Sequence, residues 1–306
     1  MNVTIFAGKG GVGKSTSAVA YALQKAKKSR NLIIDYDGGH SIPTVLSLEN
    51  KNHKSNKIIL TKIKNINIAL IDLIKFQPIK EIKKQKKSIE EYLSQFKADY
   101  GIVPFCDMIT SFFGAPTDIT SVSCFASLID VYHKAKRQKI DNIVIDVEPT
   151  AGLERLLNST ESITKSMKNL QKIGLIALTA VGTVWPDIKT YLKGDYIKNA
   201  EIYAKRLNDT AKALENANYF LVCNPEKSPV DEMQEVKGII SNYNGKIIGY
   251  IINNIRGESY EKKQIQRVNK QADNLPIIEI KHDLRLCDSN SKSRLIALKE
   301  AGALFQ

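Results

Sequence analysis

Ala7-Gly8-Lys9-Gly10-Gly11-Val12-Gly13-Lys14-Ser15-Thr16 follows a short apolar run, residues 2–6, and leads into a sequence of helical character that extends to about residue 27. A glycine, four residues and then Gly-Lys-Ser form the pattern of a phosphate-binding loop between a strand and a helix. Glycines let backbone N–H groups turn toward phosphate oxygens, and the helix N-terminus adds its positive dipole. Lys14 can reach the β- and γ-phosphates, and the Ser15 hydroxyl can hold Mg²⁺. The residues expected to bind ATP or ADP are Gly8, Lys9, Gly10, Gly11, Val12, Gly13, Lys14, Ser15 and Thr16. The alternative is a glycine-rich turn without a ligand.

The composition is that of one globular domain. The chain has 306 residues, of which 43% are apolar, enough for the core of a single α/β domain over residues 1–306. No apolar run is long enough to span a bilayer and no signal peptide is evident, so we expect a cytoplasmic protein. A formal net charge of +13 could serve nucleic acid or an anionic membrane, but the basic residues are scattered, which favours solvated lysines over a nucleic-acid partner. The four cysteines contain no Cys-x-x-Cys pair, so no zinc site is predicted.

Apolar, strand-like runs alternate with helical segments along the chain. The expected strands lie at residues 31–37, 58–72, 141–146, 219–224, 246–253 and 276–280, and the expected helices lie at about 118–137, 186–216, 259–274 and 290–303, with one more opening near Pro229. This alternation predicts βαβ units and therefore a doubly wound, mostly parallel sheet.

Polar residues end three of these strands. Asp37 is placed to orient or polarise an attacking water, although a helix cap or a turn would also explain it. Asp35, two residues earlier, is expected to be structural. Asp146 is expected near Mg²⁺, directly or through water. Asn253 could read adenine by donating and accepting with one amide, or it could close a turn.

Lys9 is a second lysine that an ordinary phosphate-binding loop does not need. Together with Lys14, in the form Lys-Gly-Gly-Val-Gly-Lys-Ser-Thr, it resembles the deviant Walker A loop of the SIMIBI class of P-loop ATPases. Asp37-Gly-Gly-His-Ser-Ile resembles switch I of ArsA-type ATPases, and Asp146 to Leu157 resembles their switch II. Val222-Cys-Asn-Pro-Glu-Lys resembles their turn after a strand. The chain as a whole thus resembles the ArsA-type family, which includes arsenical-pump ATPases and the ATPases that escort tail-anchored proteins to membranes.

This resemblance implies a Mg²⁺-dependent ATPase that works as a homodimer. Lys9 would act on the partner's nucleotide, Lys14 on its own nucleotide, and Asp37 on the attacking water. Switch II would include Pro149, Thr150 and Arg155, and the nucleotide site would also include Pro225, Glu226 and Asn253. A helical subdomain would be inserted at about residues 77–137 and 158–217. Within it, residues 100–115 and 168–190 are either ordinary core or a groove for a hydrophobic client segment, with membrane association through a receptor.

The chain also departs from the family pattern. Gly38-Gly39 replaces Pro-Ala in switch I, Gly152 replaces the switch II histidine, and the zinc-binding Cys-x-x-Cys pair of eukaryotic targeting dimers is missing. One alternative is a ParA- or MinD-like positioning ATPase on DNA or a membrane surface, which the net charge and Gly152-Leu153 favour and the long insertion opposes. A further alternative is an arsenite-efflux pump ATPase, which needs clustered thiols that the cysteine spacing does not offer.

Overall fold

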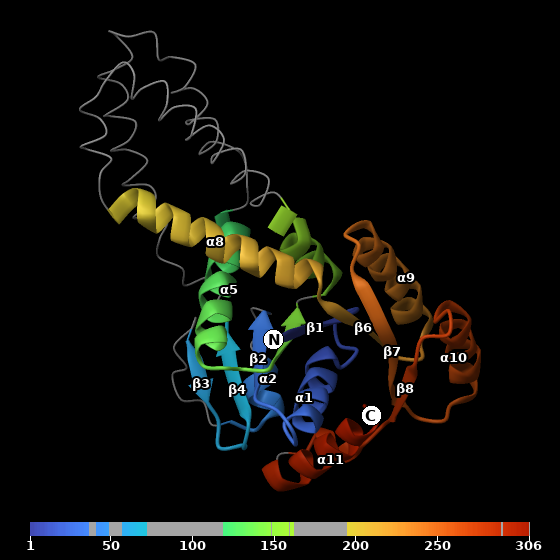
Figure 1. Cartoon of the computed structure of the whole chain (residues 1–306). Helices are drawn as coiled ribbons and strands as arrows, with labels where there is room; N and C mark the ends of the chain where they lie inside the picture. Colours follow the sequence, from blue (N-terminus) through green and yellow to red (C-terminus); the bar gives the residue numbers. More distant parts are fainter. Residues whose placement is uncertain are drawn as a thin grey trace, which may run out of the picture.

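The computed structural model describes residues 1–36, 41–48, 57–71, 119–147, 149–158, 160–161, 195–288 and 290–305. Its strands are β1 (Asn2–Ala7), β2 (Asn31–Tyr36), β3 (Ile58–Leu60), β4 (Ile66–Leu70), β5 (Asn142–Val147), β6 (Asn218–Cys223), β7 (Lys246–Ile255) and β8 (Ile277–Lys281). Its helices are α1 (Lys14–Lys25), α2 (Ser41–Val45), α5 (Ile119–Arg137), α8 (Asp195–Glu215), α9 (Lys227–Asn242), α10 (Ser259–Gln271) and α11 (Ser291–Ala303), with a 3₁₀ turn, η1 (Leu284–Leu286) (Figure 1). Residues 150–158 are also helical.

The eight strands form one sheet in the order β3-β4-β2-β5-β1-β6-β7-β8. Every neighbouring pair is parallel except β3 with β4, which is antiparallel at the edge. The prediction of a doubly wound, mostly parallel sheet is therefore confirmed. β1 lies between β5 and β6, with Phe6 opposite Asp146 and Ala7 opposite Leu221. The loops that follow these three strands consequently emerge at the same edge of the sheet.

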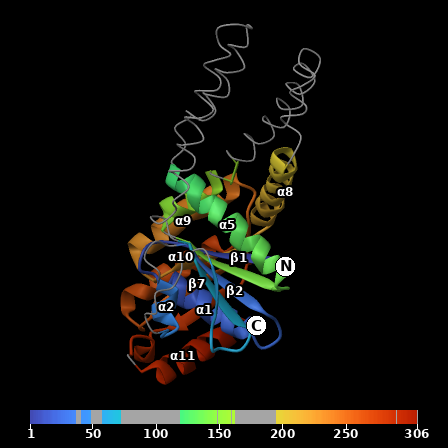
Figure 2. The same cartoon turned by 90° about the vertical axis from the view of Figure 1, so that its left-hand side faces the viewer.

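Helices cover both faces of the sheet, as a buried parallel sheet requires. Successive strand residues alternate between two cores. Leu32 and Ile34 belong to the core that also contains residues of α5, α8, α9 and α10, whereas Ile33 belongs to the core that contains residues of α1, α2 and α11. Figures 1 and 2 show the two helical layers on opposite sides of the sheet. Because side chains alternate between the two faces of a strand and both faces are covered by helices, these strands are continuous runs of apolar residues without a polar face.

The C-terminal helix α11 packs directly on α1, the helix that follows the glycine-rich loop (Figure 1). The contact is close because Gly302 has no side chain: a Cβ there would lie 2.5 Å from the carbonyl oxygen of Ala20. Phe305, just after α11, completes an aromatic cluster, with its ring centroid 5.5 Å from that of Tyr21 and 6.4 Å from that of Phe6. The first and last helices are therefore one packing unit.

The predicted helical insertion lies largely outside the described residues. Its described parts are α5 and α8, which pack against each other on the same face of the sheet. Residues 100–115 and 168–190, predicted to be either ordinary core or a groove for a client, are not among the described residues. None of the described helices combines the length and the apolar character needed to cross a bilayer.

Candidate active site

The glycine-rich loop runs from the carboxyl end of β1 to the start of α1. Gly11 and Gly13 have φ values of 78° and 88°, in the left-handed region that only glycine adopts readily. A Cβ on Gly13 would also overlap the side-chain amide of Asn253. The backbone of this loop can therefore curl into a concave set of N–H groups of the kind that binds phosphate, at the N-terminus of a helix.

Lys14 is folded back over the loop. Lys14 is only 6% exposed, and its Nζ donates a hydrogen bond to the carbonyl oxygen of Lys9 at 2.9 Å. A buried ammonium beside the concave face of the loop is placed to neutralise phosphate charge. Binding of the β- and γ-phosphates by Lys14 remains a prediction.

A chain of three side chains lies beside the loop. Ser41 Oγ donates to Asp146 Oδ2 at 3.5 Å, near the limit for such a bond, and lies 2.7 Å from Ser15 Oγ. Because a hydroxyl carries one proton, a Ser41 that donates to Asp146 accepts the proton of Ser15. The lone pairs of Ser15 are then left for a cation.

These donors suit Mg²⁺. Hydroxyl and carboxylate oxygens are the ligands that this hard cation prefers, and it commonly keeps several waters and binds substrate phosphates as well. The described residues contain no group of three or more His, Cys, Asp or Glu side chains that could hold a metal by themselves. The arrangement therefore fits a cation shared with a nucleotide rather than a metal cage made by the protein alone.

Ser41 owes its position to Asp35. The carboxylate of Asp35 is fully buried, and its Oδ2 accepts the backbone N–H of Ile42 at 2.9 Å, in the first turn of α2. Asp35 thereby fixes the start of α2, which agrees with the structural role expected for it. Asp37, the predicted water-activating residue, lies with residues 38–40 outside the described residues.

The turn after β6 and the end of β7 border the loop from the other side. Asn253 Nδ2 donates to the carbonyl oxygen of Val12 at 2.9 Å, so this amide supports the loop itself. Pro225 and Glu226 lie directly before α9, and Glu226 is the N-cap residue of that helix. Contacts of these three residues with a nucleotide, including adenine reading by Asn253, remain predictions.

Lys9 points toward α9. Its Nζ donates to Ser228 Oγ at 2.6 Å and forms an ion pair with Glu232 Oε2 at 3.1 Å. Glu232 also accepts a hydrogen bond of 2.9 Å from Thr150 Oγ1, in the predicted switch II segment. Of the other predicted switch residues, Pro149 lies beside the loop, 3.4 Å from where a Cβ on Gly10 would be.

The structure places one further predicted residue and adds three that the sequence did not predict. Arg155, predicted as part of switch II, is exposed on the helix of residues 150–158. Ser41, Ser228 and Glu232 were not predicted as site residues. The position of Ser41 within the switch I-like motif was a usable signal. Nothing local in the sequence indicates that Glu232 reaches Lys9, because more than two hundred residues separate them.

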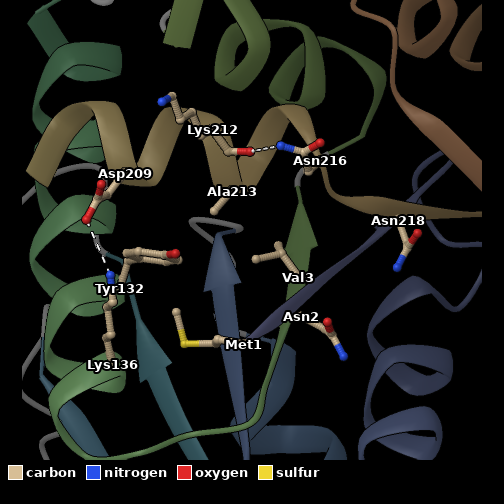
Figure 3. Close-up of a pocket in the computed structure, with 10 residues that line it drawn as sticks. All are labelled: Met1, Asn2, Val3, Tyr132, Lys136, Asp209, Lys212, Ala213, Asn216 and Asn218. Atoms are coloured by element: carbon tan, nitrogen blue, oxygen red, sulfur yellow. Dashed lines mark hydrogen bonds and ion pairs between the residues drawn. The ribbon is translucent and has the colours of Figure 1, made fainter.

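A separate cavity of about 360 Å³ lies at the opposite edge of the sheet (Figure 3). Asn2 and Val3 of β1 and Asn218 of β6 line it at the amino ends of their strands, away from the loop at the carboxyl end of β1. Two of its lining residues, Lys136 of α5 and Asp209 of α8, form an ion pair at 3.3 Å, which connects the two helices. This cavity does not belong to the candidate active site.

The loop, the sheet around it and the hydroxyl–carboxylate cluster are together those of a P-loop nucleoside triphosphatase. Within this class the chain belongs to the ArsA ATPase family, described as anion-transporting ATPases, which matches residues 1–291. The family resemblance seen in the sequence motifs is thus confirmed, and the chain is an ATP-hydrolysing enzyme.

Its curated relatives are distant but similar over most of this chain. The putative arsenical pump-driving ATPase 2 of Aquifex aeolicus is 24% identical over 268 residues, which cover 85% of this chain and 82% of that protein. The putative arsenical pump-driving ATPase of Chlorobaculum tepidum is 23% identical over 265 residues, which cover 83% of this chain and 61% of that protein. A second Aquifex aeolicus protein, putative arsenical pump-driving ATPase 1, is 25% identical over 76% of this chain and 58% of its own length. The chain therefore spans about three fifths of the latter two relatives.

Proposed function

We propose that this protein is a Mg²⁺-dependent ATPase whose two copies close around their nucleotides, and that this cycle controls the binding of a hydrophobic client segment. The observation that carries the first part is the chain from Ser15 through Ser41 to Asp146 beside a loop of phosphate-binding shape. Ser15 lies in the first turn of α1 and Asp146 near the carboxyl end of β5, and only the folded sheet brings them together. Their oxygens support Mg²⁺ in particular.

The protein's own contribution to hydrolysis is electrostatic. Lys14 and the loop N–H groups would hold the β- and γ-phosphates and stabilise the charge that develops on them. Ser15 and Asp146, the latter directly or through water, would hold Mg²⁺, which when bound neutralises phosphate charge. Asp37 would orient the attacking water. If so, Asp37→Asn should bind ATP and hardly cleave it in a single-turnover assay; cleavage near the wild-type rate would remove Asp37 from this role.

The homodimer rests on Lys9. Lys14 already occupies the inner face of the loop, whereas the Lys9 side chain is 36% exposed and lies beside α9, paired with Glu232. A partly exposed lysine that is not used by its own loop could turn to a nucleotide on a facing copy, as the resemblance implies. Sedimentation of Asp37→Asn with ATP should show a dimer that is absent with ADP. Lys9→Ala in the same background should stay monomeric, and a dimer of unchanged affinity would refute action across the interface.

The client is proposed from the sequence and the family resemblance. Residues 100–115 carry few charges, residues 173–185 within the range 168–190 carry none, and the two ranges precede α5 and α8 in the chain. Co-expression with a protein ending in a single apolar anchor helix should yield a complex, whereas an anchor with two central leucines changed to arginine should not be retained. Equal retention of both anchors would refute a hydrophobic groove. A test for delivery of the client to a membrane through a receptor would be the next experiment once such a complex is seen.

A second candidate is coupling to an arsenite pump, which the printed names of the relatives favour. Arsenite binds thiolates, and Cys223 is unsuited to this because burial raises the pKa of its thiol to about 12. The direct test is the steady-state ATPase rate with and without arsenite. Stimulation would support this candidate, and its absence would leave the client-binding proposal in place.

A further inference from the structure

One carboxylate on α9 joins two segments of the active site. Glu232 Oε2 pairs with Nζ of Lys9 at 3.1 Å, and Glu232 Oε1 accepts from Thr150 Oγ1 at 2.9 Å. Each oxygen is used for a different partner: one on the phosphate-binding loop, the other in the predicted switch II segment. Ser228, one helical turn before Glu232, accepts a second hydrogen bond from Lys9 at 2.6 Å.

We propose that Glu232 is a positioning residue that holds Lys9 within its own protomer and releases it when two nucleotide-bound copies meet. This inference rests on the proposed function, in which Lys9 serves the nucleotide of the partner copy. Lys9 Nζ already directs two of its three N–H donors at Glu232 and Ser228 of α9, so binding of a phosphate on the partner copy competes with these contacts. The Lys9–Glu232 pair therefore opposes dimerisation until the nucleotide offers more negative charge than the carboxylate does.

Thr150 gives this contact a second consequence. Because the same carboxylate binds Lys9 and Thr150, movement of the switch II segment withdraws a hydrogen bond from Glu232, and departure of Lys9 leaves the carboxylate to Thr150 alone. One side chain, Glu232, thus contacts both the loop lysine and switch II, so a movement of either one affects the other. This links the interface to the segment expected to respond to the γ-phosphate.

Three acidic side chains lie on α9, and among the described residues only Glu232 forms an ion pair with Lys9. Asp231 is engaged by Lys227 at 2.8 Å and by Arg267 of α10 at 2.5 Å, so it is directed away from the loop. Glu235 is exposed, about one turn farther along the helix, and forms no ion pair among the described residues. Glu235→Gln is therefore a matched control, since it removes the same charge from the same helix without touching Lys9.

The experiment measures self-association of the full chain with a non-hydrolysable ATP analogue and Mg²⁺ by sedimentation. Glu232→Gln removes the charge but keeps a polar side chain of the same shape. The concentration for half-association should fall about two- to thirtyfold, because each of the two protomers no longer has to give up a partly exposed ion pair. Glu235→Gln should leave it unchanged. In a Lys9→Ala background, Glu232→Gln should bring no further gain.

Three results would overturn the inference. These are an unchanged half-association concentration in Glu232→Gln, an equal shift in Glu235→Gln, and a shift of the same size in the Lys9→Ala background. If the wild-type protein does not associate at all, the proposed dimer fails, and the second readout decides on Glu232 alone. That readout is amide hydrogen exchange of residues 150–158 without nucleotide, which Glu232→Ala should accelerate and Glu235→Ala should not; equal exchange in both would overturn the inference.

Discussion

Ser41→Ala tests the cation site with a change of one oxygen atom. Ser41 accepts from Ser15 at 2.7 Å and donates to Asp146 at 3.5 Å, so the first bond is good and the second is weak. Losing one good neutral hydrogen bond is worth about 0.5–1.5 kcal/mol, and every 1.4 kcal/mol is a factor of about ten. Without Ser41 the Ser15 proton needs another acceptor, and Ser15 is no longer oriented toward a cation. The Mg²⁺ concentration for half-maximal ATP hydrolysis should therefore rise about two- to tenfold.

The assay is ATP hydrolysis over a titration of Mg²⁺ at saturating ATP. Ser17→Ala is the control, because the buried Ser17 hydroxyl lies on the same helix as Ser15 and makes no hydrogen bond among the described residues. It should leave the Mg²⁺ dependence unchanged. The reasoning fails if Ser41→Ala titrates like the wild-type protein, or if Ser17→Ala shifts the curve as much as Ser41→Ala does.

Three further predictions concern the loop, the packing of the ends and the thiols. Lys14→Ala should lower the rate of ATP cleavage about a hundred- to a thousandfold, because it removes a buried charge aimed at the phosphates; single-turnover kinetics measure this. Gly302→Ala should lower the free energy of unfolding by about 1–3 kcal/mol in urea titration, because its methyl group would meet the carbonyl of Ala20. At pH 8 an alkylating reagent should label the exposed Cys287 and leave the buried Cys223 unlabelled until the protein unfolds, as peptide mass mapping would show; labelling of Cys223 at the same rate would contradict its burial.

Most of the fold could be predicted because its signals are local. The apolar run at residues 141–146 became β5, and the helix expected from about residue 118 to residue 137 is α5. Capping residues set the ends of some helices. At the start of α11, the side chain of Asn290 accepts hydrogen bonds from the N–H groups of Lys292 and Ser293. The short helix α2 was not predicted, because five residues carry too little periodicity to detect.

In the candidate site too, the residues with local sequence signals could be predicted, and those placed by long-range contacts could not. The glycine-rich loop is continuous in the sequence, so its members and its shape could be predicted together. Asp146 was predictable as the acidic end of a parallel strand. Ser41 depends on the hydrogen bond from Ile42 to Asp35, and Glu232 depends on α9 lying beside the loop. Such contacts are decided by the order of strands in the sheet, which a single sequence does not display.

The packing of α11 on α1 has a consequence for how the protein is made. The loop and α1 leave the ribosome early, but the helix that covers α1 is synthesised only after α10 and β8. Until then, the side of α1 around Ala20 and the rings of Phe6 and Tyr21 lack Gly302 and Phe305 as partners. A nascent chain therefore keeps an apolar side of α1 uncovered until its last helix is made, and apolar surface that is exposed for a time during folding favours aggregation.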